Sequence, residues 1–288
     1  MFVLVLTGSC NNNCMFCYQD KNFSLDTEKA KSLIMEAKDR GESHINFFGG
    51  EPTIHPDFFE LVKYVKEEGL DFSLNSNLRL LSYRKVAKNI VDFEPVSIQT
   101  SLHGHNAEIH DRLTRTDGSF EQATNGIKNL LDLGYERERI LVNTVITKIN
   151  MKYLEEIANL ILNEIQLPAT KFSFMEIERD AFKNAKELLP QYKEIYPFLE
   201  KAARHAQKSG KRIYIEKGPI CFCPDLSNVD YIFEKVLLDT KRFIQTPSCS
   251  MCPSHVKCDG IHRNYAAFYP VGELKKKKIS KLKVIFRG

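Results

Sequence analysis

CNNNCMFC, residues 10–17, places Cys10, Cys14 and Cys17 in one short turn directly after the apolar run 2–6, which is typical of a β-strand. A structural zinc ion and a closed iron–sulfur cluster each use four protein ligands. Three thiolates at this spacing therefore indicate a four-iron cluster in which one iron stays free for substrate chemistry. The open position is more informative than the cysteines themselves.

Two other interpretations of the three cysteines are weaker. A zinc site would need a histidine such as His44 or His55, and neither has a second ligand at the spacing of a zinc finger. Disulfides are disfavoured because the opening MFVLVLT lacks the basic segment and the longer apolar stretch of a signal peptide. We therefore expect a reduced, cytoplasmic protein.

Strand-like and helix-like segments alternate after this turn. Apolar, β-branched or aromatic runs predict strands at 2–6, 44–48, 71–74, 96–101, 140–146 and 171–175. Amphipathic spacing predicts helices over 26–40, 57–68, 81–92, 120–133 and 151–164. Consecutive βα units of this kind predict an α/β protein with a parallel sheet, and periodicity leaves open whether that sheet is open or curled.

Glycines and polar side chains follow these strands. Gly49 and Gly50 end the second strand, Asn75 and Asn77 end the third, and Ser101 ends the fourth. Because ligands of α/β folds bind at the carboxyl ends of the strands, we expect these residues to lie near a site. An ordinary turn is the alternative at each position.

The spacing Cys-x3-Cys-x2-Cys, with Phe16 just before the last cysteine, resembles the signature of the radical S-adenosylmethionine (radical SAM) superfamily. The resemblance implies a partial (β/α)6 TIM-like barrel and a [4Fe-4S] cluster on Cys10, Cys14 and Cys17. It also implies that the open iron binds SAM, which is then cleaved to a 5′-deoxyadenosyl radical that abstracts hydrogen from a substrate. A low-potential electron donor such as ferredoxin or flavodoxin would supply the electron.

The resemblance also implies which residues bind the cofactor. The GGEP segment would contact the SAM amino group, and a serine and an arginine after the fourth strand, Arg112 or Arg115, would hold its carboxylate and ribose. The expected cofactor-binding residues are Phe16, Gly49, Gly50, Glu51, Asn75, Ser101 and Arg112.

Four further polar residues have an open interpretation. His103 stands where relatives often carry an aspartate, so an acid–base role there is in doubt, and His103 and His105 are equally compatible with facing solvent. Asn143 and Asn150 fall where relatives are also polar, and a turn or helix cap explains Asn150 equally well.

A second cysteine set lies in the last quarter of the chain, where the spacing Cys-x2-Cys-x5-Cys resembles the SPASM and twitch auxiliary-cluster modules. The full SPASM pattern has another cysteine where this chain has His262, so we expect one auxiliary iron–sulfur cluster. Structural zinc is the alternative, and we favour Cys221 over Cys223 as the fourth ligand. The expected ligands are Cys221, Cys249, Cys252 and Cys258.

These patterns predict a radical SAM core over 1–209, an auxiliary module over 210–274 and a basic tail over 275–288. The tail holds seven of the 41 basic residues and none of the 37 acidic ones, so the body of the chain is mildly acidic. No apolar run approaches the roughly eighteen residues of a membrane span.

The leading hypothesis is a radical SAM oxidoreductase or maturase that acts on a peptide, a protein or a small metabolite. Only nine residues precede Cys10, which disfavours a peptide-recognition segment there. There are two alternatives. The first is an RNA-modifying radical SAM enzyme, which the basic tail suggests and which is less favoured than the leading hypothesis. The second is a non-catalytic iron–sulfur electron carrier.

Overall fold

The computed structural model describes residues 1–234, 241–273 and 278–287, and the chain divides into two compact units. Unit 1 comprises residues 1–13, 19–102 and 114–142. Unit 2 comprises residues 14–18, 103–113 and 143–288. One boundary between the units falls inside the cysteine turn, between Asn13 and Cys14.

The strands of the main sheet follow the order β1-β2-β3-β4-β5-β6-β7-β8-β11, and β9 and β10 form a separate antiparallel pair. Neighbouring strands are parallel from β1 to β4 and again across β6, β7, β8 and β11. The strands are β1 (Phe2–Thr7), β2 (His44–Gly49), β3 (Asp71–Asn75), β4 (Ser97–Ser101), β5 (Ile140–Val145), β6 (Ala169–Ser173), β7 (Arg212–Glu216), β8 (Val229–Glu234), β9 (Phe243–Ile244), β10 (Ile261–His262) and β11 (Lys283–Arg287).

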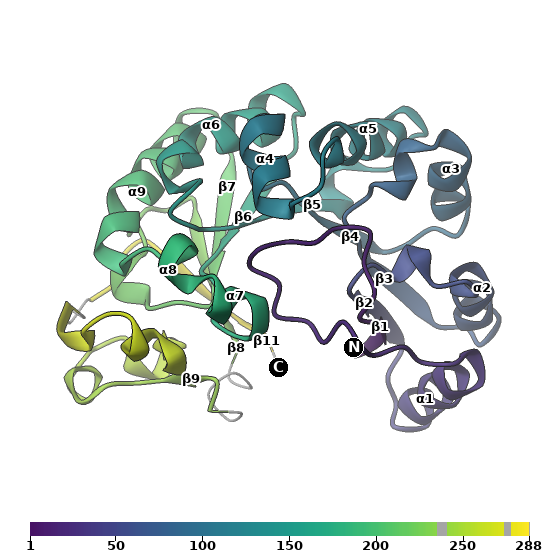
Figure 1. The fold of residues 1–288 in the computed structure, drawn as a ribbon, viewed down its shortest axis with the longest axis horizontal. Coiled ribbons are helices and arrows are strands. Elements are labelled where there is room, and N and C mark those ends of the chain that lie inside the picture. The colour runs from purple at the N-terminus through teal and green to yellow at the C-terminus, as the bar shows by residue number, and fades with distance from the viewer. Residues whose placement is uncertain (235–240, 274–277, 288) are drawn as a thin grey trace. The chain divides into compact units, whose positions relative to one another are not determined.

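The helices are α1 (Thr27–Asp39), α2 (Phe58–Glu67), α3 (Arg84–Asp92), α4 (Ala107–Thr114), α5 (Ser119–Asp132), α6 (Leu154–Asn159), α7 (Arg179–Lys183), α8 (Ala185–Leu188) and α9 (Tyr192–Lys208). Among them, α1, α2, α3 and α5 agree closely with predicted amphipathic segments, whereas α4, α7, α8 and α9 lie outside those segments. The predicted helix 151–164 is split into a 3-10 turn, α6 and a π-helical turn, Leu160–Glu164. In Figure 1, α1, α2 and α3 lie along the outer side of β1 to β3, and α6 and α9 lie outside β6 and β7.

Unit 1 is held together by apolar packing under its outer helices. Ile34 of α1 and Leu61 of α2 are fully buried, as is Phe47 on β2. The backbone N–H of Lys29 donates to the Asp26 carboxylate at 2.8 Å, which caps the first turn of α1. This side chain fixes the start of α1 where the sequence predicts it.

Unit 2 continues the parallel sheet beyond the six predicted strands. These further strands are β7, β8 and β11. The described part of the predicted basic tail, residues 278–287, therefore includes a sheet strand. The Asp225 carboxylate accepts hydrogen bonds from the backbone N–H groups of Ser280, Lys281 and Leu282, which anchors the entry to β11.

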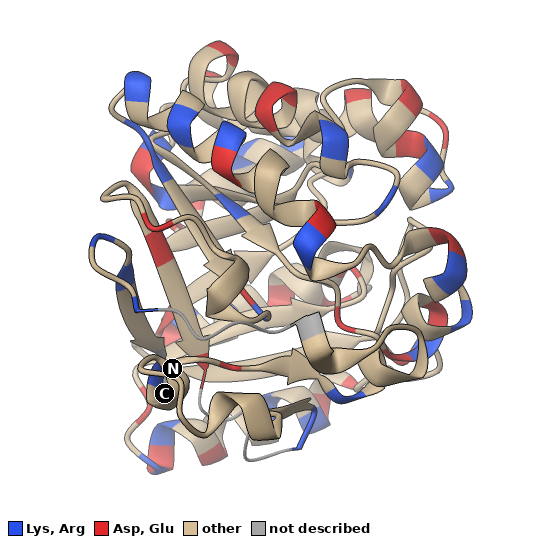
Figure 2. Ribbon diagram, turned by 90° about the vertical axis from the view of Figure 1, so that its left-hand side faces the viewer, with Lys and Arg blue, Asp and Glu red and all other residues tan. Residues whose placement is uncertain are grey.

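The outer helices carry both signs of charge. Figure 2 shows Lys and Arg beside Asp and Glu along the same helices on the face in view. Among the described residues, no helix combines the length and the apolar character needed to cross a membrane.

Candidate metal centre and cofactor site

Cys10 lies in unit 1 among hydrogen-bond donors. The backbone N–H of Asn12 donates to Cys10 Sγ at 3.3 Å, and Asn77 Nδ2 lies 3.6 Å from the same sulfur. Asn77 Nδ2 also donates to the Asn11 side-chain oxygen at 2.6 Å. Donors aimed at a sulfur stabilise its thiolate form, which is the form that binds iron. Asn77, one of the two asparagines predicted after the third strand, thus contacts the cysteine turn.

Arg79 is a functional candidate that the sequence did not single out. Its Nη1 donates to the Asn11 carbonyl and, at 2.9 Å, to Asn12 Oδ1. Its Nε donates to Gln122 Oε1 on α5 at 2.6 Å. A guanidinium makes several bonds in fixed directions, so Arg79 fixes the start of the cysteine turn against α5. No motif marks it, because its partners are distant in sequence.

Gly49 and Gly50 let the chain that leads to Cys10 pack directly on the end of β2. A Cβ atom at Gly49 would lie 2.2 Å from the Thr7 carbonyl oxygen, and one at Gly50 would lie 2.2 Å from that of Ser9. The backbone N–H of Gly50 donates to the Thr7 carbonyl at 2.6 Å. The absence of side chains here serves to position the cysteine turn. Contact of these glycines with SAM stays a prediction.

Glu51 is fully buried, and its carboxylate accepts hydrogen bonds from other residues of unit 1. Its Oε1 accepts from the Thr53 hydroxyl at 2.6 Å and from the Ser76 hydroxyl at 2.8 Å. Its Oε2 accepts from the backbone N–H of Asn77 at 2.7 Å. Burial raises the pKa of Glu51, although these hydrogen bonds oppose the rise. Glu51 therefore connects the loop after β2 to the loop after β3, and its predicted contact with SAM remains to be tested.

Cys14 and Cys17 lie in unit 2. The backbone N–H of Cys17 donates to the Cys14 carbonyl at 3.2 Å, which closes a tight turn. The Cys17 carbonyl accepts from Asp180 N at 3.1 Å, at the start of α7. Between the two cysteines, Phe16 is buried and its ring meets that of His103 edge-on, with ring centroids 4.5 Å apart. Phe16 thus anchors the turn in the core of unit 2.

The solvent-facing interpretation of His103 is wrong. His103 is buried, and its Nδ1 accepts a hydrogen bond from the backbone N–H of Val145 at 3.3 Å. Burial, with a smaller contribution from His110, lowers the pKa of His103 well below its ordinary value. The ring is therefore neutral and acts as packing for Phe16. Asn150 is fully buried and donates to the His103 carbonyl at 2.9 Å, which fits the alternative of a structural turn.

Three of the residues predicted to bind the cofactor, Asn75, Ser101 and Arg112, make no described contact with the cysteine turn. Asn75 and Ser101 are half-buried at the carboxyl ends of β3 and β4 in unit 1. Arg112 is mostly exposed on α4 in unit 2 and pairs with Glu187 at 3.2 Å. Their predicted roles toward SAM are not tested by these positions.

The cysteines expected to bind an auxiliary cluster surround one cavity in unit 2. Four thiols line it, and they belong to Cys221, Cys249, Cys252 and Cys258. Cys223 does not line it, and its thiol points to the Pro219 carbonyl at 3.8 Å. Among the described residues, no three Cys, His, Asp or Glu side chains are already gathered as ligands of a single metal ion.

Cys258 is the most deeply placed of these four cysteines. Its sulfur accepts from the backbone N–H groups of Ile220 at 3.3 Å and Gly260 at 3.4 Å. Burial nevertheless raises the pKa of the Cys258 thiol to about 12. A cationic centre in the cavity would compensate this burial and deprotonate the thiol. The donor set and its surroundings therefore fit a thiolate-bound cluster.

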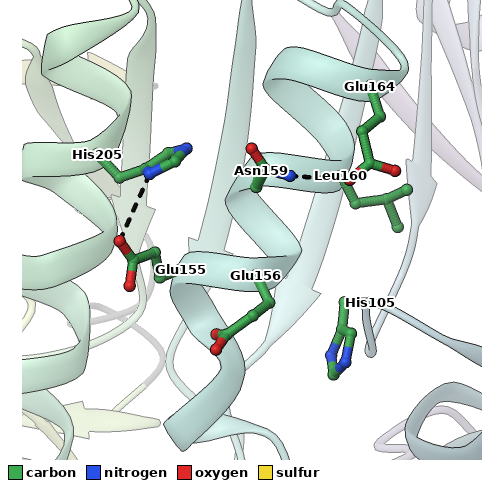
Figure 3. A pocket seen from close by; sticks show the side chains of 7 residues that line it. All are labelled: His105, Glu155, Glu156, Asn159, Leu160, Glu164 and His205. Carbon is green, nitrogen blue, oxygen red and sulfur yellow. Dashed lines mark hydrogen bonds and ion pairs between the residues drawn. The ribbon is translucent and has the colours of Figure 1, made fainter.

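A second cavity of about 350 Å³ in unit 2 contains none of the cysteines. Figure 3 shows that α6 and the π-helical turn supply its acidic side chains, that α9 supplies His205, and that the loop between β4 and α4 supplies His105. Most of these groups pair with one another: His205 lies 3.5 Å from Glu155, and Asn159 donates to Glu164 at 2.8 Å. His105 faces this cavity, and its ring is tilted by 45° against that of Tyr153 with ring centroids 5.0 Å apart.

Known proteins resemble this chain over its first half. Residues 4–161 match the model of the radical SAM superfamily. The mycofactocin maturase MftC of Mycobacterium tuberculosis (strain CDC 1551 / Oshkosh) is 35% identical over 161 residues, which are 54% of this chain and 40% of the relative. The AdoMet-dependent heme synthase of Oleidesulfovibrio alaskensis is 32% identical over 166 residues, which are 55% of this chain and 41% of the relative. The chain thus spans about two fifths of the length of these relatives.

Solved structures share the fold. Streptococcus suis SuiB bound to the precursor peptide SuiA has a TM-score of 0.61 at 13% identity, covering 83% of this chain and 50% of SuiB. The enzyme anSMEcpe with bound AdoMet and the Cp18Cys peptide has a TM-score of 0.60 at 19% identity, covering 74% of this chain and 62% of that protein. The expected partial (β/α) barrel is confirmed at the level of fold. Because the family model matches more than half of this chain, the chain belongs to the radical SAM superfamily.

Proposed function

We propose that this protein is an enzyme that cleaves SAM reductively and uses the resulting radical to abstract hydrogen from a substrate. The observation that carries the proposal is the turn 10–17, in which three cysteines stand at the spacing of the family within its matched segment. As a member of the superfamily, the chain uses a [4Fe-4S] cluster and SAM. When bound, the cluster supplies the electron that splits SAM into methionine and a 5′-deoxyadenosyl radical.

The protein's own residues would bind and orient these cofactors. Cys10, Cys14 and Cys17 would ligate the cluster. Hydrogen bonds from Asn77 would adjust its potential, as N–H donors to ligand sulfurs do in other iron–sulfur sites. SAM would occupy the free iron beside the residues predicted to contact it, which are Phe16, Gly49, Gly50, Glu51, Asn75, Ser101 and Arg112.

The four thiols that line one cavity of unit 2 support an auxiliary iron–sulfur cluster, with Cys221 as the fourth ligand. Four cysteine thiolates complete a closed cluster and leave no iron open. A centre of this kind is suited to transferring electrons, so it would accept the electron that remains after hydrogen abstraction. This role fits a net oxidation of the substrate.

The substrate class is a peptide, a protein or a small metabolite. The matched relatives carry names with different chemistries, a mycofactocin maturase and a heme synthase among them, and SuiB was solved with a precursor peptide. Their names therefore do not select one substrate for this chain. A low-potential carrier such as ferredoxin or flavodoxin is the electron donor that the proposed reaction requires.

The test is SAM cleavage by the protein purified and reconstituted without oxygen. With a strong reductant, the wild-type protein is expected to form 5′-deoxyadenosine, and Cys14→Ala is expected to form none because the cluster loses a ligand. Cys223→Ser is the matched control, since this cysteine lies outside the turn 10–17 and does not line the cavity formed by the other four C-terminal cysteines. Wild-type protein that holds its cluster and SAM and yields no 5′-deoxyadenosine would refute the proposed function.

A further inference from the structure

A group of buried charges stands in unit 2, one residue away from a predicted cluster ligand. Tyr18 directly follows Cys17, and its ring lies under two cations: Lys217 Nζ is 5.2 Å and the Arg242 guanidinium carbon 5.7 Å from the ring centroid. Glu176 follows β6, and Lys217 directly follows β7. Residues at the carboxyl ends of strands are the usual ligand contacts in barrels of this type.

The described members of this group carry more positive than negative charge. Glu176, whose side chain is 3% exposed, pairs with both cations: its Oε1 lies 2.7 Å from Lys217 Nζ, and its Oε2 accepts from Arg242. The neighbouring buried pair of Lys171 and Glu216, 3.0 Å apart, is neutral as a whole. Among the described residues of the group, three cations thus face two carboxylates.

The positive groups retain donors for a further partner. Lys217 is held in its charged form, because the surrounding anions and Tyr18 raise its pKa although burial alone would lower it. An ammonium has three donors and a guanidinium has five, and Glu176 accepts one from each. The side chain of Arg242 is 32% exposed, so this member of the group reaches solvent.

His262 adds an unpartnered donor next to Arg242. His262 is fully buried, and Phe243, which follows Arg242, is its cross-strand partner in the β9–β10 pair. Its Nδ1 accepts from the backbone N–H of Asn264 at 3.2 Å, so the proton lies on Nε2. Nε2 has no hydrogen-bond partner, and the Glu178 oxygen nearest to it is 3.6 Å away. A buried donor without a partner is costly, and a ligand acceptor would satisfy it.

We propose that Lys217, Arg242 and His262 form a subsite for an oxyanion of the substrate, a carboxylate or a phosphate. This inference rests on the proposed function, since it places the subsite beside the radical chemistry. A buried ion-pair group is a poor source of stability in itself, because the desolvation of its charges offsets their attraction. The excess charge and the unsatisfied His262 donor are accounted for by a bound anion. The substrate is accordingly an acid that presents its anionic group to this subsite.

The test measures anion binding to the reconstituted protein with SAM by isothermal titration calorimetry at constant ionic strength. The probes are inorganic phosphate and acetate, and the tighter of the two identifies the class of oxyanion. We expect saturable binding of one anion per chain, weakened at least tenfold in Arg242→Gln and in Lys217→Met. Arg204→Gln, which removes an exposed arginine paired with Glu200 on α9, is the control and should bind like wild type. Arg242→Lys, which keeps the charge, should recover part of the affinity.

The inference is overturned if neither probe binds the wild-type protein, or if Arg242→Gln and Lys217→Met bind as tightly as wild type. Formation of 5′-deoxyadenosine is measured on the same preparations. Cleavage of SAM without anion binding would remove the subsite and leave the proposed function intact. Anion binding without cleavage would remove the proposed function and with it the assignment of the anion to a radical substrate. Circular dichroism of each variant separates lost binding from lost folding.

Discussion

The sulfur of Cys10 lies near two N–H donors from different segments of unit 1. One donor comes from the turn itself, the Asn12 backbone, and the other from Asn77 after β3. The backbone donor is present whichever side chain occupies position 12, whereas the second depends on the Asn77 amide. Asn77 is therefore the side chain through which the end of β3 acts on the expected cluster.

We expect Asn77→Ala to reduce cluster retention or SAM cleavage by about 10-fold to 100-fold, the usual cost of removing a group that supports a metal ligand. The reduction potential should also become more negative, because a hydrogen bond to the ligand sulfur is lost. Iron content, potentiometry and 5′-deoxyadenosine formation measure the three effects. Asn159→Ala on α6 is the control, and equal behaviour of the two variants would contradict the role of Asn77.

The buried pair of Lys171 and Glu216 gives a pH dependence of stability. Burial alone would raise the pKa of Glu216, but Lys171 and Lys217 outweigh it and lower the pKa from 4.5 to about 2. A carboxylate with a depressed pKa in the folded state stabilises the fold above its ordinary pKa. That stability is lost as the pH falls from about 4.5 toward 2.

We expect Glu216→Gln to lower the free energy of unfolding at neutral pH by about 3–5 kcal/mol, because Lys171 is left as a buried charge without its partner. The difference from wild type should shrink as the pH falls below about 4.5. Denaturant unfolding of both proteins at matched pH values measures it. Glu200→Gln, an exposed change on α9, should show little difference at any pH.

At the scale of elements, the backbone of the loop after β2 packs directly against the backbone of the segment after β1. We expect Gly50→Ala to displace the segment that leads to Cys10, since the new methyl group would overlap the carbonyl oxygens of Ser9 and Gly8 at 2.2 and 2.4 Å. Loss of iron on purification is the measurement. Gly272→Ala, where a methyl group meets nothing within 4 Å, is the control, and normal iron retention by Gly50→Ala would contradict the assigned role.

The elements that the sequence predicted are those with a local signal. The helix over 26–40 carries its periodicity and its cap, Asp26, within a few residues, and the structure starts α1 at Thr27. The strand β8 was missed because its near-continuous burial gives no alternation, and β11 because its basic residues resemble a solvated end. Their pairing is long-range, and no short window of sequence contains it.

The same limit applies to the candidate site. The cysteines and glycines have motifs with fixed spacing, so they could be singled out from the sequence. Arg79 and the group around Lys217 could not, because each acts through residues far away along the chain: Arg79 through Gln122, and Lys217 through Glu176 and Tyr18. The burial of His103 was equally invisible, since it depends on Phe16 and Val145.

At the scale of the whole molecule, the two sets of cysteines predict the metal content. We expect about eight irons and no zinc per chain after anaerobic reconstitution, because two four-iron clusters would be bound. Iron, acid-labile sulfide and zinc analysis measures this. About four irons without zinc would remove the auxiliary cluster, and about four irons with one zinc would favour the structural alternative. Cys221→Ser should lose the second set of irons, whereas Cys223→Ser should keep it.

A cluster bound in the cavity lined by Cys221 and Cys258 would also affect the stability of the fold, because it would connect two distant points of the chain. The segment between these two cysteines contains β8, the strand that holds β11 in the sheet. Iron bound at both ends of this segment would act as a cross-link that restricts the unfolded chain, as a disulfide does. Oxidative destruction of the cluster would remove this cross-link. Exposure to oxygen would therefore destabilise β8 and β11 at the edge of the sheet, in addition to stopping electron transfer through the cluster.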